Sequence, residues 1–166
     1  MSDSNDDRVL RPTRIDIPAE VRLHLIQLLN QTLACATDLR SHVKQAFWNV
    51  KGRESSVLRM LFKAIASELE DYADLVADRI VVLGGLALVT AREAASHSSL
   101  LEYPSHITNG EAYIVALAER FAQYGRAVRS GISQAADVED SVTAAIYTDI
   151  LRGVDKRLSC LEAHLR

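Results

Sequence analysis

Two pairs of like-charged residues lie in one predicted helix, and their types and spacing are the strongest chemical signal in the sequence. Arg59 and Lys63 are four residues apart, and Asp74 and Asp78 repeat this spacing further along. Residues at i and i+4 lie one above the other on a helix, so each pair is a compact doublet of one charge. Two carboxylates arranged in this way can supply half of a metal site in a helical bundle. The neighbouring cations would repel a metal ion.

The residues around these doublets predict four long amphipathic helices. Apolar side chains recur at helical spacing in four segments, which are approximately 18–50, 55–84, 114–132 and 142–165. Gly52 and Gly84-Gly85 are the predicted ends of the first two helices. The long connection 86–108 is expected to hold a short helix in TAREAASHSS and a loop in LEYPSHITNG. An all-α, ferritin-like four-helix bundle, with a short helix in the connection between helices 2 and 3, has this layout.

Length and composition are those of one globular domain. The chain has 166 residues, of which 48% are hydrophobic and 25% charged. We expect a flexible polar tail over residues 1–17 and the bundle over 18–166. A formal net charge of −3 excludes a generally basic surface for nucleic acid. Because no apolar run is long enough to span a membrane, and no leader pattern is present, we expect a cytoplasmic protein.

The order of several short segments resembles the Dps family of bacterial mini-ferritins. The segments are KQAFWNVKG, LGG, EYPSHI, ALAERF and VDKRLSCLEAHL, and the likeness runs from about Ile17 to the C-terminus. The resemblance implies four-helix subunits that assemble as homo-oligomers into hollow dodecamers. Such proteins bind and oxidise Fe(II), preferably with hydrogen peroxide, store the ferric mineral inside, and in some members bind DNA.

The ferroxidase ligands that the resemblance implies are only partly present. The family has a histidine where this chain has Phe47, and a second histidine and an aspartate where it has Arg59 and Lys63. From the partner subunit the family supplies an aspartate and a glutamate, which correspond here to Asp74 and the shorter Asp78. The catalytic site is therefore expected not to be intact, with Asp74 and Asp78 as a residual metal half-site.

The chemistry of the three substituted residues supports this expectation. Phe47 has no lone pair, an arginine such as Arg59 stays protonated in proteins, and Lys63 would have to lose its proton before it could bind a metal. Our hypothesis is that ion pairs between these cations and the carboxylates of a neighbouring subunit replace the iron. Any iron at this interface is then expected to be weakly bound or absent.

Other residues suggest lesser roles. Of the acids near the start of the last helix, Asp140 is the best candidate for an ion-entry pore, since a ring of carboxylates attracts cations. The tail has no lysine and its arginines are offset by aspartates, so DNA binding through it is not expected. Trp48 is interpreted as interface packing. The histidines, among them His42 and His97, are interpreted as surface or hydrogen-bonded residues without ligand-like spacing to acids on one helix face.

Three functions follow from these observations. The first is a Dps-like cage for iron sequestration, storage and protection from oxidative stress, in which the usual interface ferroxidase site is lost. The second is a ferroxidase, an enzyme oxidising Fe(II), with a remodelled metal site. The third is a non-catalytic structural cage, either a natural paralogue or an engineered variant.

Overall fold

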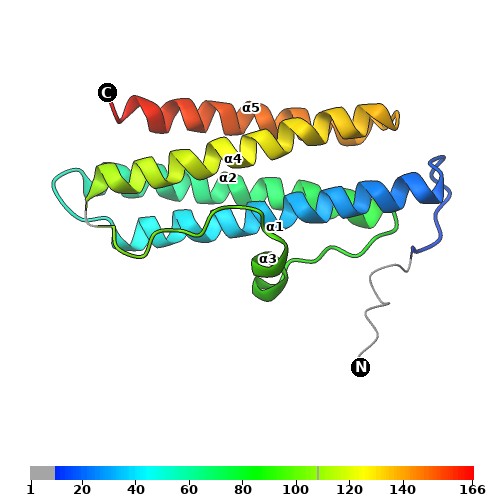
Figure 1. Ribbon diagram of the computed structural model, residues 1–166, viewed down its shortest axis with the longest axis horizontal. Coiled ribbons are helices and arrows are strands. Elements are labelled where there is room, and N and C mark those ends of the chain that lie inside the picture. The colour runs from blue at the N-terminus through cyan, green and yellow to red at the C-terminus, as the bar shows by residue number, and fades with distance from the viewer. Residues whose placement is uncertain (1–9, 108) are drawn as a thin grey trace.

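The computed structural model describes residues 10–107 and 109–166, which form four long helices and one short helix (Figure 1). The helices are α1 (Ala19–Asn49), α2 (Ser55–Val82), α3 (Ala91–His97), α4 (Gly110–Asp137) and α5 (Ser141–Ala163). The predicted all-α bundle, with a short helix in the connection between the second and third long helices, is confirmed. The observed bounds lie within a few residues of the predicted ones.

The bundle is made of two helical hairpins. α1 packs mainly on α2 and α4 on α5, and the hairpins meet through α1 with α4 and through α2 with α5. The interior is apolar, with Leu29 and Leu39 from α1, Phe62 from α2 and Phe121 from α4 fully or almost fully buried. Burial of this apolar surface holds the helices together, since propensity alone does little for a helix in water.

Local sequence signals explain where the helices begin and end. Pro18 precedes the first residue of α1, and the Asn109 side chain accepts a hydrogen bond from the Ala112 N–H at the start of α4. At the end of α2, Gly84 has a φ of 90°, and a Cβ there would lie 2.6 Å from the Arg11 carbonyl oxygen. Only glycine fits this turn without strain.

The segment before α1 contacts the end of α2. The Arg11 N–H donates to the Gly84 carbonyl oxygen at 2.9 Å, and Ile17 packs against the core. A flexible tail over residues 1–17 stays a prediction, of which residues 1–9 lie outside the described part of the chain. No helix within the described residues is long and apolar enough to cross a membrane.

Candidate functional site

The outward face of α2 carries both charged doublets. Arg59, Lys63, Asp74 and Asp78 are all exposed, and none of the four forms an ion pair within the described residues. Lys63 precedes Asp74 by 11 residues, which is about 16 Å along a helix that rises 1.5 Å per residue. The cationic and acidic doublets therefore cannot meet within one copy of the chain.

Phe47 lies beside the cationic doublet, at the end of α1. The Arg59 Cζ is 6.0 Å from the centroid of the Phe47 ring, and the Lys44 Nζ is 5.6 Å from it. The Phe47 and Trp48 rings also meet in a T-shaped arrangement, with centroids 5.0 Å apart and ring planes at 79°, and Trp48 is 64% exposed. The structure thus brings together Phe47 and Arg59, two of the three residues predicted to stand in place of metal ligands. Their contact is a cation beside an aromatic face, an arrangement that attracts cations without offering a lone pair.

The predicted ligand positions do not gather into a metal-holding cluster among the described residues of one copy. Within the residues that the structure describes, no group of three or more His, Cys, Asp or Glu side chains has a metal-holding arrangement. Asp74 and Asp78 remain a doublet of two carboxylates, one turn apart on α2. They could ligate a cation only together with groups from another molecule.

Asp140, the acid singled out as a pore candidate, lies inside the subunit. It is 5% exposed and caps α5 by accepting from the N–H groups of Val142 and Thr143, each at 3.2 Å. Arg79 Nη2 donates to both carboxylate oxygens, at 3.0 and 2.9 Å, and Thr143 Oγ1 donates to Oδ2. Burial alone would raise the pKa of Asp140, but the hydrogen bonds from Thr143 and Arg79 outweigh it and lower this pKa.

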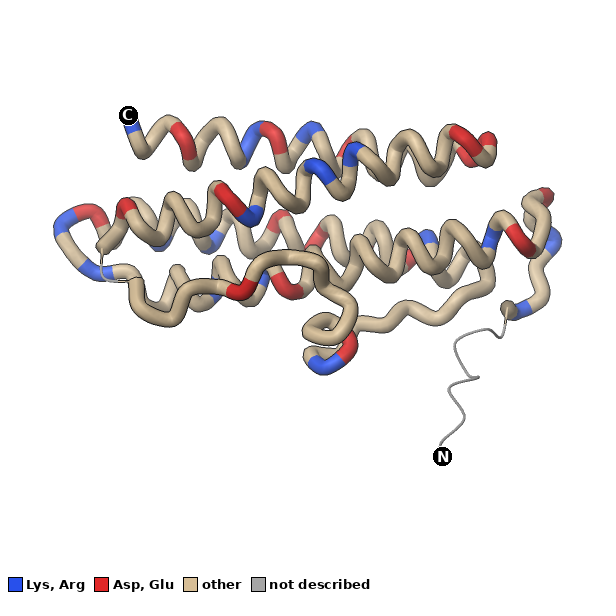
Figure 2. The backbone as a smooth tube through the Cα atoms, in the orientation of Figure 1, with Lys and Arg blue, Asp and Glu red and all other residues tan. Residues whose placement is uncertain are grey.

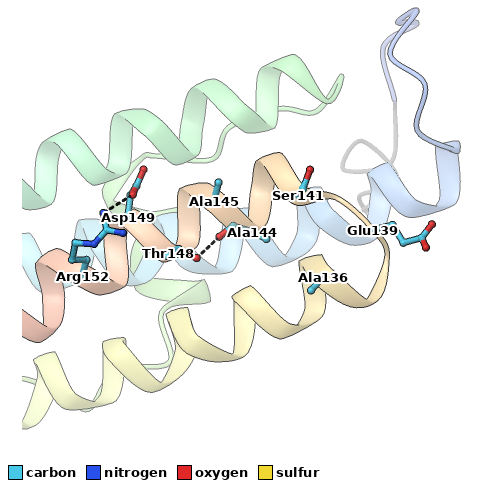
Figure 3. Close-up of a pocket in the computed structure, with 8 residues that line it drawn as sticks. All are labelled: Ala136, Glu139, Ser141, Ala144, Ala145, Thr148, Asp149 and Arg152. Carbon is cyan, nitrogen blue, oxygen red and sulfur yellow. Dashed lines mark hydrogen bonds and ion pairs between the residues drawn. The ribbon is translucent and has the colours of Figure 1, made fainter.

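A shallow surface hollow extends from the turn between α4 and α5 along the first half of α5 (Figure 3). Its lining includes the acids Glu139 and Asp149, and Asp149 accepts from Arg152 at 3.0 Å, whereas Asp140 is not part of the lining. A pore role for Asp140 stays a prediction, and its carboxylate would first have to leave Arg79. The acids that line the open surface here are Glu139 and Asp149, whereas Asp140 is buried.

The interpretation of the histidines was wrong on one point. Two of them share a helix face with an acid four residues earlier: His42 Nε2 lies 3.1 Å from Asp38 Oδ1, and His97 Nδ1 lies 3.3 Å from Glu93 Oε2. The i,i+4 spacing was visible in the sequence. His97 is exposed, but His42 is only 7% exposed and belongs to a buried polar cluster.

Charge is interspersed over the molecule. Figure 2 shows basic and acidic positions alternating along the long helices, without one continuous basic stretch in this view. This pattern agrees with the net charge of −3.

Comparison with known proteins places the chain in a family. The model of the ferritin-like domain matches residues 26–166. A DNA protection during starvation protein from Agrobacterium fabrum is 34% identical over 154 residues, which is 93% of this chain and 95% of that protein. DpsC from Streptomyces coelicolor superposes with a TM-score of 0.92 at 20% identity, over 99% of this chain and 96% of that chain.

A Dps protein from Vibrio cholerae, described as a member of a broad superfamily of ferritin-like diiron-carboxylate proteins, superposes with a TM-score of 0.88. It is 22% identical, and the match covers 95% of this chain and 99% of that chain. At these identities the two structures show the fold alone, whereas the Agrobacterium protein is similar in sequence over nearly its full length. The chain belongs to the Dps family of ferritin-like proteins.

Proposed function

We propose that this chain is the subunit of a hollow homo-oligomeric cage, a dodecamer, that sequesters Fe(II) and protects against oxidative stress. Membership of the Dps family supports this role. The Agrobacterium relative is named for DNA protection during starvation, and the Vibrio neighbour is described as one of the ferritin-like diiron-carboxylate proteins. Iron is the cargo of such a cage, and hydrogen peroxide is its oxidant.

We further propose that the usual interface ferroxidase site is lost. The observation that supports this proposal is that the residues at three of the expected ligand positions cannot bind a metal ion in their ordinary protonation states. Phe47 and Arg59 are in contact, and Lys63 lies one turn further along the same face of α2. Two fixed positive charges would repel Fe(II), and neither a phenyl ring nor a guanidinium offers it a lone pair. Oxidation at this interface is therefore expected to be slow or absent.

The spacing of the charges indicates what replaces the metal. Arg59, Lys63, Asp74 and Asp78 fall within an arc of about 100° on α2, as 3.6 residues per turn requires. When two copies of α2 run antiparallel, Arg59 lies opposite Asp78 of the partner subunit and Lys63 opposite Asp74 of the partner subunit. Both residue pairs are centred on the same point along α2, between Glu68 and Leu69. A single two-fold axis through that point would therefore bring both pairs together.

A two-fold interface of this kind is self-complementary, because the cations of each copy face the carboxylates of the other copy. The cations would neutralise carboxylates that otherwise need a metal ion. Trp48 and Met60, which are 64% and 75% exposed, lie near the cationic doublet and would supply apolar area to the same contact.

The test combines iron binding with particle size. Purified protein is titrated with Fe(II) under anaerobic conditions in a calorimeter, hydrogen peroxide is then added while ferric absorbance is followed, and particle mass is measured by light scattering. We expect a particle of dodecamer mass without stoichiometric tight binding and with slow oxidation. Tight binding of one or two irons per subunit, followed by rapid oxidation, would instead support a remodelled ferroxidase site.

A variant that restores the missing ligands is the matched control. Phe47→His, Arg59→His and Lys63→Asp together replace the three substituted side chains by the types that the family resemblance implies. This variant is expected to gain tight Fe(II) binding and rapid peroxide-driven oxidation in the same assay. If the wild type forms an iron core without interface binding, it is a storage cage. If it forms neither core nor complex, it is a structural shell and the iron role is wrong.

A further inference from the structure

Residues 98–103, here called the strap, leave α3 and continue along the bundle toward the first turn of α4 (Figure 1). Polar side chains from two helices hold this segment. Ser98 Oγ donates to Asp38 Oδ2 on α1 at 2.6 Å, and Arg120 Nη2 on α4 donates to the Glu102 carbonyl oxygen. Gln123 on α4 binds the middle of the strap, accepting from the Leu101 N–H at 3.0 Å and donating to the Ser99 carbonyl oxygen at 2.7 Å. The strap is therefore held by polar contacts along its length.

His42 lies at the centre of these contacts. It is 7% exposed, and its ring packs against the Tyr103 ring of the strap with centroids 5.1 Å apart. Its Nε2 faces Asp38 Oδ1 at 3.1 Å, so the neutral imidazole carries its hydrogen on Nε2 and donates it to Asp38. Arg120, itself 5% exposed, lies over the same Tyr103 ring with its Cζ 5.9 Å from the centroid.

A second proton on His42 would have no acceptor within the described residues. His42 Nδ1 is buried without a hydrogen-bond partner, and so are Tyr103 Oη and Arg120 Nε nearby. Protonation would create a buried N–H donor without an acceptor and place a second cation near Arg120. Both changes cost free energy in a site that excludes water.

The charged groups around His42 act in opposite directions. Burial lowers the pKa of His42, the Asp38 carboxylate opposes this, and Arg120 lowers the pKa further, so that the net shift is downward. Tyr103 stays neutral, because burial raises its pKa, and Glu119 pairs with Arg120 at 3.0 Å from the exposed side. The attraction between Asp38 and an imidazolium is thus outweighed.

We propose that His42 is an acid-sensitive switch whose protonation releases the strap from α1 while the four long helices stay folded. The core of the bundle is apolar, and the strap meets it through the buried Tyr103, the half-buried Leu100 and the contact of Ser99 with Cys35 Sγ. The four long helices also pack directly on one another, so opening of the strap is a local event.

The direction of the pH dependence follows from linkage. A histidine with a lowered pKa in the closed state binds its proton more readily when the strap is open. Closure is therefore fully favoured above the ordinary histidine pKa of about 6.5 and is weakened as pH falls below it. Since one proton is coupled to opening, the open fraction rises about tenfold per pH unit within this window.

The experiment is hydrogen exchange read by mass spectrometry on the assembled protein between pH 7.5 and 5, with amide rates corrected for their intrinsic pH dependence. Peptides covering 98–107 are expected to lose protection by about tenfold per pH unit below about 6.5, whereas peptides from the middle of α1 and α4 keep theirs. The pH dependence of exchange of the His42 ring C2 hydrogen, measured in the same samples, should give a pKa below the ordinary histidine value of about 6.5.

Two variants make the result decisive. His42→Gln is expected to abolish the pH dependence of strap protection, whatever its absolute level, while His106→Gln, an exposed histidine of the same connection, retains it. The proposal fails if strap protection is equal at pH 7.5 and 5, if acid tightens the strap, or if the pH dependence survives in His42→Gln.

Discussion

Arg79 and Asp140 form a buried ion pair that joins α2 to the first turn of α5. The Arg79 side chain is 10% exposed and that of Asp140 3%, and one guanidinium nitrogen donates to both carboxylate oxygens. Arg79 Nε also donates to Thr143 Oγ1 at 3.0 Å. Asp140 thus serves at once as the partner of a buried cation and as the cap of a helix.

Removal of this carboxylate is expected to destabilise the subunit strongly. Asp140→Ala leaves the Arg79 charge buried and uncompensated, which costs about 3–5 kcal/mol, and also removes the cap of α5. Asp140→Asn keeps a capping oxygen and should be less destabilising by about 1 kcal/mol. Chemical denaturation at a fixed subunit concentration measures the free energy of unfolding. The exposed Asp149→Ala is the control, with an effect under about 1 kcal/mol; equal effects of Asp140→Ala and Asp149→Ala would contradict this assignment.

The contribution of Asp140 is expected to depend on pH. Because its pKa is lowered in the folded state, the stabilisation is complete above the pKa of an unfolded aspartate, about 4, and is lost as pH falls through the folded value. The difference in unfolding free energy between wild type and Asp140→Asn should be constant from pH 7 to 5 and shrink below about pH 4. Comparison with the asparagine variant isolates this group from the other carboxylates. A difference in unfolding free energy between the two proteins that stays the same down to pH 3 would contradict this prediction.

The proposed interface predicts a charge-swap result. Changing Arg59 and Lys63 to Asp puts four carboxylates on this face of α2 in each copy. Because these carboxylates repel one another across the interface, the subunit concentration at which the assembly dissociates should be at least about tenfold higher for the variant than for the wild type. Adding Asp74→Lys and Asp78→Lys to the same chain restores opposite charges across the two-fold axis and should restore assembly. Mass photometry over a dilution series measures both. Unchanged assembly of the double variant, or no recovery in the quadruple variant, would show that these residues do not face each other.

Two glycines of α4 are expected to differ sharply in their tolerance of alanine. A Cβ at Gly131 would lie 2.7 Å from two atoms of the buried Tyr147 ring, whose hydroxyl is held by Thr32 at 2.7 Å. Gly131→Ala should therefore cost about 1–3 kcal/mol of stability through overpacking. At Gly125 the nearest atom, on Val154, is 3.4 Å away, and the gain of about 1 kcal/mol in helix propensity offsets the tighter contact. Thermal unfolding of both variants tests the contrast, which equal melting temperatures would disprove.

The positions of the helices could be predicted from the sequence because their causes are local. Apolar residues at helical spacing, a proline before α1 and glycines at the ends of α1 and α2 act within a few residues of chain. The i,i+4 doublets on α2 were equally readable, since helix geometry alone puts Arg59 above Lys63 and Asp74 above Asp78. The absence of part of the ligand set that the family resemblance implies was also predicted from the sequence, and it stays a prediction.

The partners of the buried polar groups were decided by the tertiary structure alone. In the sequence Asp140 looks like an unpaired acid, yet in the structure it forms an ion pair with Arg79, which lies 61 residues earlier in the chain. His42 reads as an ordinary histidine in the sequence, yet it is buried against Tyr103 and lies within the electrostatic influence of Arg120. Spacing along one helix cannot reveal such contacts, because they depend on which faces of separate helices meet once apolar surface is buried. Local geometry thus determined the helices of this protein, and packing determined which of its charges are paired.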